Sequence, residues 1–265
     1  MKQAGNKKAE KLKDYFRELE SSAIAFSGGV DSGVLAKTAH KALGKKAIAF
    51  TIDSPTVDRK ELKDAIKLAK QIGIRHLVIR HDELKNECFR RNDPDRCYHC
   101  KKEMLAVLKK AASEQGINTV IEGTNADEIL GHRPGYKAVK EAGVRSPLAE
   151  LGYSKKDIRE IATFLKLPNA QKPSIACLSS RIPYGTEITK ELLDKVSRAE
   201  ATVRAAGAVQ LRVRCFGDLA VIEVLEEDYN KIIRDSSRIA KELKALGFKR
   251  VVMDLEGYST GSMSR

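Results

Sequence analysis

The sequence has no apolar run near the roughly 20 residues that cross a membrane. It begins MKQAGNKKAEKLKDYF, a polar and helix-like segment without the apolar core and cleavage site of a secretory signal. We therefore expect a cytoplasmic protein with no membrane partner. The cysteines are few, odd in number and unevenly spaced, which in a reducing compartment favours metal or catalytic use over disulfides. They are Cys88, Cys97, Cys100, Cys177 and Cys215.

Basic residues exceed acidic ones, with 49 Lys and Arg against 36 Asp and Glu in 265 residues, a net charge of +13. This excess favours polyanionic partners such as nucleotides, phosphorylated substrates or RNA, although many soluble proteins carry a basic surface. The basic residues are spread along the chain and form no arginine-rich tail. We therefore expect a small phosphorylated ligand and no nucleic acid.

Short apolar segments alternate with amphipathic ones over the first 170 residues. This alternation predicts an α/β fold, a parallel sheet with helices on both faces. The sequence predicts strands at 23–26, 47–52, 76–79 and 119–123, and helices at 34–43, 59–72, 101–115 and 154–165.

The order of predicted strands and helices changes after a proline-containing linker at 167–173. A helix pattern at 187–207 is followed by an expected antiparallel hairpin, 210–215 with 219–225. A helix at 226–246 and a strand at 250–255 complete this part. We expect two domains, 1–170 and a small α+β domain at 171–265.

The segment Ser27-Gly28-Gly29-Val30-Asp31-Ser32 joins the first predicted strand to the first predicted helix. A glycine turn at a helix start exposes backbone N–H groups, and the helix dipole adds positive charge, so the site suits phosphate. No Walker A motif is present. The segment matches S-G-G-x-D-S at every position and so resembles the PP-loop ATP pyrophosphatases. This resemblance implies an adenine nucleotide alpha hydrolase-like fold, ATP and Mg²⁺ as cofactors, and cleavage of ATP to AMP and pyrophosphate.

Two further loops follow predicted strands and should open onto the same sheet edge, because parallel strands end along one edge. In the first loop, we expect Thr51 and Ser54 near adenine or ribose.

The second loop is 123–128. Gly123 and Thr124 would let the backbone approach a phosphate, and Asp127 and Glu128 offer oxygen ligands for Mg²⁺. An Asn- or Asp-capped helix start is the structural alternative.

The pair Cys97-Tyr98-His99-Cys100 is a C-x-x-C motif. It fits a redox pair, half of a zinc site or part of an iron–sulfur site. A Cys₄ zinc site needs a second pair, which the sequence lacks. With the distant Cys177, three thiolates fit a [4Fe–4S] cluster that has one iron open to a sulfide or a substrate. Cys88 and Cys215 are most simply structural.

Segments 27–32, 122–128 and 173–181 together closely resemble the LarE family of sulfur transferases, over nearly the full chain. The resemblance implies adenylation of a carboxylate of a pyridinium-3,5-dicarboxylate mononucleotide and replacement of its oxygen by sulfur, in nickel-pincer nucleotide synthesis. One branch sacrifices the cysteine at the position of Cys177, and the other holds a [4Fe–4S] cluster that delivers a sulfide. Because Cys97 and Cys100 are present, this chain resembles the cluster branch.

The resemblance also implies a sulfide donor and a homo-oligomer, which we expect to be a hexamer. Besides the three cysteines, Asp31 and Glu128 are expected to be catalytic. Arg212 and Arg214 alternate to one strand face, where both guanidiniums can point at one anion. The residues implied in substrate or phosphate binding are Lys101, Ser180, Arg181, Glu200, Arg212 and Arg214, with Arg133 as a further candidate.

Three other functions fit parts of the sequence. A tRNA-thiolating PP-loop enzyme would carry the same cysteines and a cluster, but the chain has no evident RNA-binding module. An amide-forming synthetase with a structural metal site would need ammonia or a glutaminase partner. A non-catalytic nucleotide-binding or metal-storage protein would release no pyrophosphate.

Overall fold

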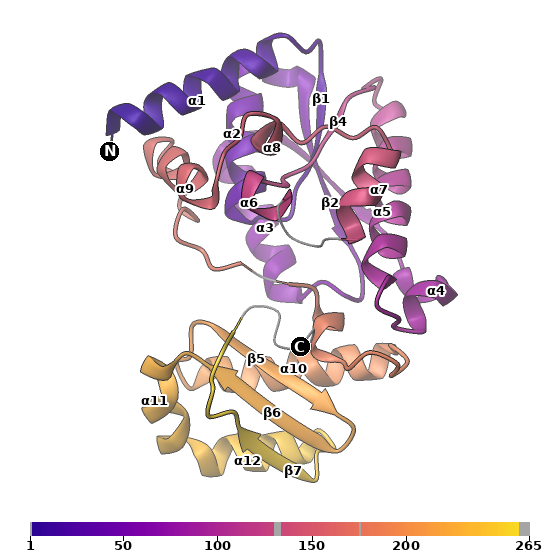
Figure 1. Cartoon of the computed structure of the whole chain (residues 1–265), viewed down its shortest axis with the longest axis vertical. Coiled ribbons are helices and arrows are strands. Elements are labelled where there is room, and N and C mark those ends of the chain that lie inside the picture. Colours follow the sequence, from indigo (N-terminus) through magenta and orange to yellow (C-terminus); the bar gives the residue numbers. More distant parts are fainter. Residues whose placement is uncertain (1, 130–133, 175, 260–265) are drawn as a thin grey trace. The chain divides into compact units, whose positions relative to one another are not determined.

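The computed structural model describes residues 2–129, 134–174 and 176–259. By its contacts the chain forms two units, Met1–Glu83 with Asp95–Ile175, and Leu84–Pro94 with Ala176–Arg265 (Figure 1). The segment Leu84–Pro94 therefore groups with the later part of the chain. A single boundary after residue 170, as expected from the sequence, remains a prediction.

The first unit is built on a parallel sheet in the order β3-β2-β1-β4. Residues in β2 pair in parallel with both β1 and β3, and β4 pairs in parallel with β1. The predicted α/β class with a parallel sheet is confirmed. The strands are β1 (Ser22–Ala25), β2 (Ala47–Asp53), β3 (Arg75–Arg80) and β4 (Val120–Ile121).

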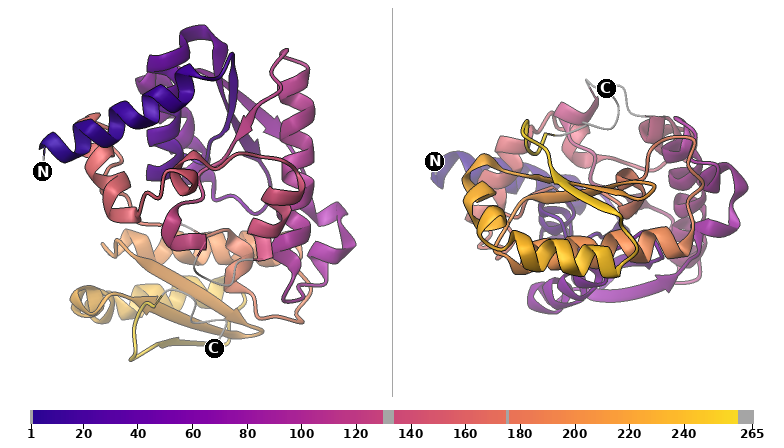
Figure 2. Two further views of the ribbon diagram at one scale, coloured as in Figure 1. Left: turned by 45° about the horizontal axis from the view of Figure 1, so that its top comes forward. Right: turned by 90° about the horizontal axis from the view of Figure 1, so that it is seen from below.

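Helices cover both faces of this sheet (Figures 1 and 2). In β1 and β2, alternate residues enter different cores: Ile24 packs with α1, α2 and α9, whereas Ala23 and Phe50 pack with α5. Strands buried on both faces explain their continuous apolar sequences. The helices of this unit are α1 (Lys2–Arg17), α2 (Val30–Leu43), α3 (Arg59–Ile72), α5 (Arg96–Ser113), α6 (Ala126–Ile129), α7 (Pro134–Glu141), α8 (Pro147–Glu150) and α9 (Lys155–Phe164).

The second unit contains a sheet in the order β5-β6-β7, with β5 and β6 antiparallel and β6 and β7 parallel. Helices α10 and α12 lie on one face of it (Figure 2), and Leu211, Val213 and Cys215 of β5 are buried. The strands are β5 (Leu211–Phe216), β6 (Leu219–Val224) and β7 (Arg250–Met253), and the helices are α4 (Glu87–Arg90), α10 (Lys190–Ala205), α11 (Tyr229–Arg234) and α12 (Ser236–Ala245).

The single helix predicted over 226–246 is wrong, because the helical pattern is interrupted at Asp235. This residue lies between α11 and α12 with φ −99° and ψ 13°. Its carboxylate accepts a hydrogen bond from Arg238 Nε at 2.8 Å. A ψ of 13° lies outside the α-helical range, so the backbone changes direction at Asp235 and the two helices are separate.

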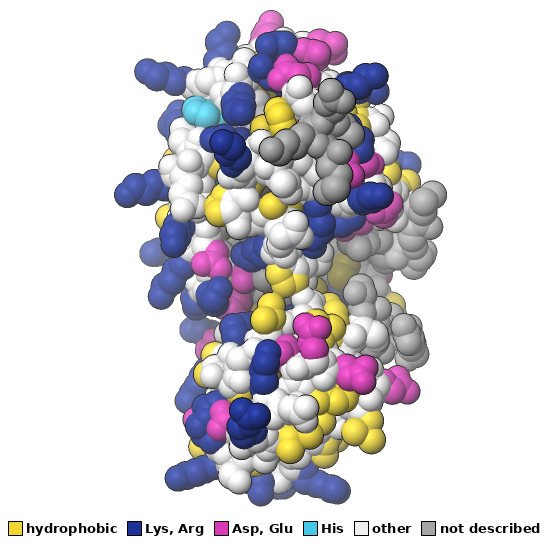
Figure 3. All heavy atoms as spheres, turned by 90° about the vertical axis from the view of Figure 1, so that its left-hand side faces the viewer, with side chains coloured by type: hydrophobic (Ala, Val, Ile, Leu, Met, Phe, Trp, Pro, Cys, Tyr) yellow, Lys and Arg dark blue, Asp and Glu magenta, His cyan; other side chains and the backbone are white. Residues whose placement is uncertain are grey.

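On the face drawn in Figure 3, Lys and Arg side chains are spread over the whole height of the molecule, with Asp and Glu side chains among them. In the described part of the chain, no helix is long and apolar enough to cross a membrane.

Phe50 tests the core between the sheet and α5, because it is only 1% exposed. Phe50→Ala should lower the free energy of unfolding by about 3–5 kcal/mol, since it removes apolar contacts and leaves a cavity. Urea denaturation followed by circular dichroism measures the change. Val78→Ala on the neighbouring strand, where Val78 is 42% exposed, is the control and should cost far less. Equal losses would contradict the assignment of Phe50 to the core.

Candidate functional site

The bend Ser27–Ser32 connects β1 to α2 and packs tightly on α3. Gly28 has φ +73°, and a Cβ there would lie 2.8 Å from the Cα and Cβ of Ala65. Only glycine fits this conformation and this spacing. Gly29 is the N-cap residue of α2 and has no side chain to occupy the N–H groups of the first turn. Those groups are the donors that bind phosphate at helix starts.

Two serine hydroxyls hold the bend together. Ser27 Oγ accepts the Gly29 N–H at 3.3 Å and lies 3.2 Å from Ser32 Oγ. Ser32 Oγ in turn donates to the Gly29 carbonyl at 3.3 Å. The first and last residues of the motif therefore close the loop around its glycines.

Asn169 supports the bend from outside the motif. Its Nδ2 donates to the carbonyl oxygens of Gly28 at 3.2 Å and Gly29 at 3.0 Å. The Gly29 N–H is bound by Ser27 Oγ, whereas the N–H groups in the first turn of α2 have no side-chain cap from Gly29 and are available to an anion. Sequence reasoning missed Asn169, because it lies in the expected linker and carries no local motif.

Lys155 was also missed, and it links two predicted residues. Its Nζ forms an ion pair with Asp31 Oδ2, and its N–H donates to Asp127 Oδ2 at 2.7 Å. The other carboxylate oxygen, Asp31 Oδ1, is buried and has no partner among the described residues. Lys155 begins α9 after a Ser154–Asp157 capping box. A lysine at a helix start opposes the helix dipole, which is the signal in the sequence that it serves another purpose.

Gly123 brings its loop against the bend, because a Cβ at this position would lie 3.3 Å from Asp31 Cβ. The structure thus brings Asp31, Gly123 and Asp127 to the same edge of the sheet, as predicted from strand polarity. Backbone packing and Lys155 join the two loops.

The 123–128 loop also has the capping geometry offered as its structural alternative. The Glu128 N–H donates to Asn125 Oδ1 at 3.2 Å, and the Asn125 N–H donates to Glu128 Oε2 at 3.4 Å. This pair starts α6. A role for Glu128 in Mg²⁺ binding or catalysis remains a prediction.

Glu122 is a buried carboxylate just before this loop. It accepts hydrogen bonds from Lys101 Nζ at 3.0 Å, from Ser146 Oγ at 2.5 Å, and from the N–H and Oγ1 of Thr124 at 3.0 and 2.9 Å. Burial by itself raises the pKa of Glu122, but Lys101 and these hydrogen bonds outweigh it and hold the pKa below its ordinary value. The predicted residues Lys101 and Thr124 thus both bind the Glu122 carboxylate.

Thr51 and Ser54 are buried near the end of β2. Thr51 Oγ1 donates to the Phe26 carbonyl at 2.6 Å and lies 2.8 Å from His76 Nε2. Ser54 Oγ lies 3.0 Å from Thr56 Oγ1. Thr51 thus ties β2 to the residue that precedes the bend, and contacts of Thr51 and Ser54 with adenine or ribose remain predictions.

Cys97 and Cys100 lie in the first turns of α5, Cys97 exposed and Cys100 partly exposed. Residues three apart share a helix face, and two cysteines placed in this way suit iron–sulfur ligation. Cys177 is exposed and belongs to the second unit. Within the described ranges, no three His, Cys, Asp or Glu side chains are grouped to hold a metal ion, and convergence of the three thiolates remains a prediction.

The remaining cysteines differ from each other in environment. Cys88 is exposed on α4, whereas Cys215 is buried in β5. Burial raises the pKa of the Cys215 thiol, which fits a packed strand residue.

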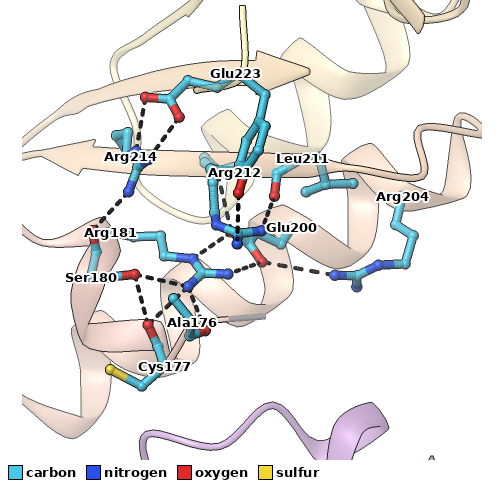
Figure 4. A network of polar contacts seen from close by, with 12 residues as sticks. Ala176, Cys177, Ser180, Arg181, Glu200, Arg204, Leu211, Arg212, Arg214 and Glu223 are labelled. Atoms are coloured by element: carbon cyan, nitrogen blue, oxygen red, sulfur yellow. Dashed lines mark hydrogen bonds and ion pairs between the residues drawn. The ribbon is translucent and has the colours of Figure 1, made fainter. Parts of the chain in front are cut away.

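The predicted residues of the later part gather around buried ion pairs (Figure 4). Arg181 pairs with Glu200, and Arg214 pairs with Glu223. Arg212 Cζ lies 5.1 Å from the ring centre of Tyr258. Burial, and then the neighbouring Arg181, lower the pKa of Arg212. Phosphate binding by these arginines remains a prediction, and Arg133 lies outside the described residues.

Comparison with known proteins identifies the family of this chain. The family model of asparagine synthase matches residues 16–212. Pyridinium-3,5-bisthiocarboxylic acid mononucleotide synthase of Lactiplantibacillus plantarum is 34% identical over 249 residues, 94% of this chain and 90% of the relative. The chain belongs to the LarE family of PP-loop enzymes. Uncharacterised proteins of Synechocystis sp. (44% identical, 97% of each chain) and Methanocaldococcus jannaschii (35% identical, 95% of this chain and 97% of the relative) are also similar.

The predicted resemblance to the LarE family is therefore confirmed. Similarity to the Lactiplantibacillus plantarum synthase runs through both parts of the chain, the PP-loop and the segment that carries Cys177. The tRNA-thiolating alternative is not favoured.

Gly28→Ala tests the close packing of the LarE-family bend. The added methyl group would lie 2.8 Å from Ala65 atoms, so the loop must shift. We expect ATP affinity, measured by calorimetric titration, to fall about tenfold or more. Gly44 also has a positive φ, +58°, but no atom lies within 4 Å of a Cβ there. Gly44→Ala should cost stability alone, and an equal loss of ATP affinity in this control would contradict the prediction.

Lys155→Met tests the ion pair with Asp31. The variant leaves a partly buried carboxylate beside the expected triphosphate without its cation, so ATP affinity should fall roughly tenfold or more. The matched control is Lys156→Met, which removes the same charge from the exposed neighbouring residue. Calorimetric titration with Mg²⁺-ATP measures both variants. Equal affinities in the two variants would show that Lys155 acts only through net charge.

Proposed function

We propose that this protein is an ATP-dependent sulfur transferase that converts a carboxylate of a pyridinium-3,5-dicarboxylate mononucleotide into a thiocarboxylate. The observation that carries the proposal is the PP-loop bend. Gly29 leaves the N–H groups in the first turn of α2 without a side-chain cap, and Asn169 binds the carbonyls of Gly28 and Gly29. The printed name of the Lactiplantibacillus plantarum relative, a bisthiocarboxylic acid mononucleotide synthase, supports the sulfur chemistry.

The first step uses ATP to activate the carboxylate. A carboxylate oxygen attacks the α-phosphorus, pyrophosphate leaves, and an acyl-adenylate forms. The N–H groups of the bend bind the departing pyrophosphate, and Mg²⁺ would be held by Asp31 and Asp127 at the sheet edge. Lys155 lies beside both residues and adds a further positive charge for the phosphates.

The second step replaces oxygen with sulfur. A sulfur nucleophile attacks the activated carbonyl carbon, and AMP leaves with the former carboxylate oxygen. Adenylation is needed because a free carboxylate oxygen is a poor leaving group, whereas AMP is a good one.

For the sulfur source we infer a [4Fe–4S] cluster held by Cys97, Cys100 and Cys177. When bound, such a cluster supplies a sulfide at the iron that has no cysteine ligand. The exposure of Cys97 and Cys177, and the position of Cys97 and Cys100 at the start of α5, support this assignment. Sulfide from a donor would recharge the cluster in a reducing compartment. A homo-oligomer, expected to be a hexamer, belongs to the same proposal.

The proposed function is tested with protein purified anaerobically and reconstituted with iron and sulfide. With ATP, Mg²⁺ and the dicarboxylate mononucleotide, we expect pyrophosphate release and a product whose mass shows exchange of oxygen for sulfur. Repeated turnover should require added sulfide. Pyrophosphate release without a sulfur-containing product would overturn the proposal.

Cysteine variants identify the sulfur source. Cys97→Ser should abolish both the cluster absorbance and repeated turnover, because the cluster loses a ligand. Cys88→Ser, which changes another exposed cysteine, is the matched control and should retain both. If Cys97→Ser stays active while Cys177 loses the mass of hydrogen sulfide, the sulfur comes from Cys177 itself and the cluster assignment is wrong.

A further inference from the structure

Cys177 precedes a short 3-10 turn, Leu178–Arg181, whose backbone is held by two arginines (Figure 4). Arg181 Nη1 donates to the carbonyl oxygens of Ala176 at 2.7 Å and Cys177 at 2.8 Å. Arg214 Nη1 donates to the Ser180 carbonyl at 2.8 Å. Three carbonyl groups around the cysteine are therefore bound by guanidinium groups.

Each guanidinium is fixed in turn by a carboxylate. Arg181 binds both oxygens of Glu200, at 2.7 and 3.1 Å, and Arg214 binds both oxygens of Glu223, at 2.9 and 2.8 Å. Two parallel hydrogen bonds set the plane of a guanidinium as well as its position. Arg181 and Glu200 are both 1% exposed, so neither can turn toward a ligand without leaving a buried charge unpaired.

The Cys177 carbonyl is the most heavily bonded group of the turn. Besides Arg181, it accepts the Ser180 N–H at 3.1 Å and Ser180 Oγ at 2.9 Å. The side chain of Cys177 is nevertheless exposed, and Figure 4 shows its sulfur pointing away from the guanidiniums. The main chain is thus fixed while the thiol stays accessible. Sulfur transfer requires this combination, because displacement of a reacting group by 1 Å can cost about 10²-fold in rate.

We propose that Arg181, held by Glu200, is a positioning residue that fixes Cys177 for sulfur transfer, and that Arg214 and Glu223 support the same turn. This inference rests on the proposed function of Cys177. It gives Arg181 and Glu200 a task different from the phosphate binding that the family resemblance implies. An arginine that binds a substrate phosphate has to release its protein partner when the substrate arrives. Arg181, in contrast, binds one carboxylate and two carbonyls of the protein.

Arg181→Lys tests the proposal, because it keeps a positive charge beside Glu200 but has three N–H donors for the four hydrogen bonds that Arg181 makes to Glu200 and the two carbonyls. The first readout is the rate at which iodoacetamide alkylates Cys177 in the full chain without iron and without substrate, where no cluster occupies the thiol, followed by peptide mass spectrometry. The second is steady-state sulfur transfer. We expect an altered alkylation rate and a kcat that is reduced by about tenfold or more, with KM for the mononucleotide unchanged.

Two further variants make the test specific. Arg204 also lies near Glu200, with 3.8 Å between Nη2 and Oε2; Arg204→Gln is the matched control and should leave both readouts unchanged. Ser180→Ala removes one donor to the Cys177 carbonyl and should change the alkylation rate in the same direction, even if Arg181→Lys does not fold.

The opposite outcome assigns Arg181 to substrate binding. If Arg181→Lys raises KM while kcat and the alkylation rate stay at wild-type values, the positioning role is wrong. An unchanged alkylation rate in Ser180→Ala would also overturn it. Because alkylation is measured without substrate, it tests the turn even if the wild-type protein forms no thiocarboxylate, which would refute the proposed function alone.

Discussion

Close backbone packing on two sides of the bend Ser27–Ser32 is the constraint on which the first unit depends. Gly28 lies against Ala65 of α3, and Gly123 lies against Asp31, with no room for a larger residue at Gly28. A rigid bend keeps its N–H groups in place before a phosphate arrives, so binding does not have to order them. The buried faces of β1 and β2 provide the support for this bend, because their alternate residues anchor both helical layers.

In the second unit, buried ion pairs fix the main chain, where the first unit uses close backbone packing. Buried ion pairs add little net stability, because desolvation offsets their attraction, but they fix geometry and are costly to break singly. Arg181–Glu200 and Arg214–Glu223 satisfy this description, with all four residues buried. Their remaining N–H groups bind main-chain carbonyls beside Cys177. The pairs therefore specify the course of the chain around an exposed thiol.

Local patterns in the sequence predicted the elements of the first unit well. The predicted strand 47–52 is observed as Ala47–Asp53, and the predicted helix 59–72 is observed as Arg59–Ile72. Gly73 ends that helix with φ +82°, as expected of a C′ glycine. These features depend on residues close in sequence. Lys155 and Asn169 contact the bend from more than 100 residues away, and no local pattern encodes such contacts.

Side-chain partners within the second unit were equally out of reach. Arg212 and Arg214 both lie in β5, as the strand prediction requires. Which group each guanidinium binds, however, depends on the neighbouring strand. The register sets Arg212 opposite Glu223 and Arg214 opposite Val221, yet Arg214 takes the Glu223 carboxylate through a diagonal contact. Diagonal partners lie within reach of long side chains. The Ser180 carbonyl also accepts a hydrogen bond from Arg214 Nη1, so this guanidinium joins the Glu223 carboxylate to a segment more than 30 residues away in the sequence.

The pairing of Asp31 with Lys155 resolves an electrostatic conflict in the bend. A carboxylate beside a triphosphate site repels the ligand, although the same carboxylate is a suitable oxygen ligand for Mg²⁺. Lys155 balances the charge of Asp31 through one oxygen and leaves Oδ1 without a partner among the described residues. In the proposed function, a cation that arrives with the triphosphate would bind that oxygen while the lysine keeps the other one, and the ammonium group would attract phosphate. In that proposal, the ion pair with Lys155 would hold Asp31 in place both before and after the nucleotide binds.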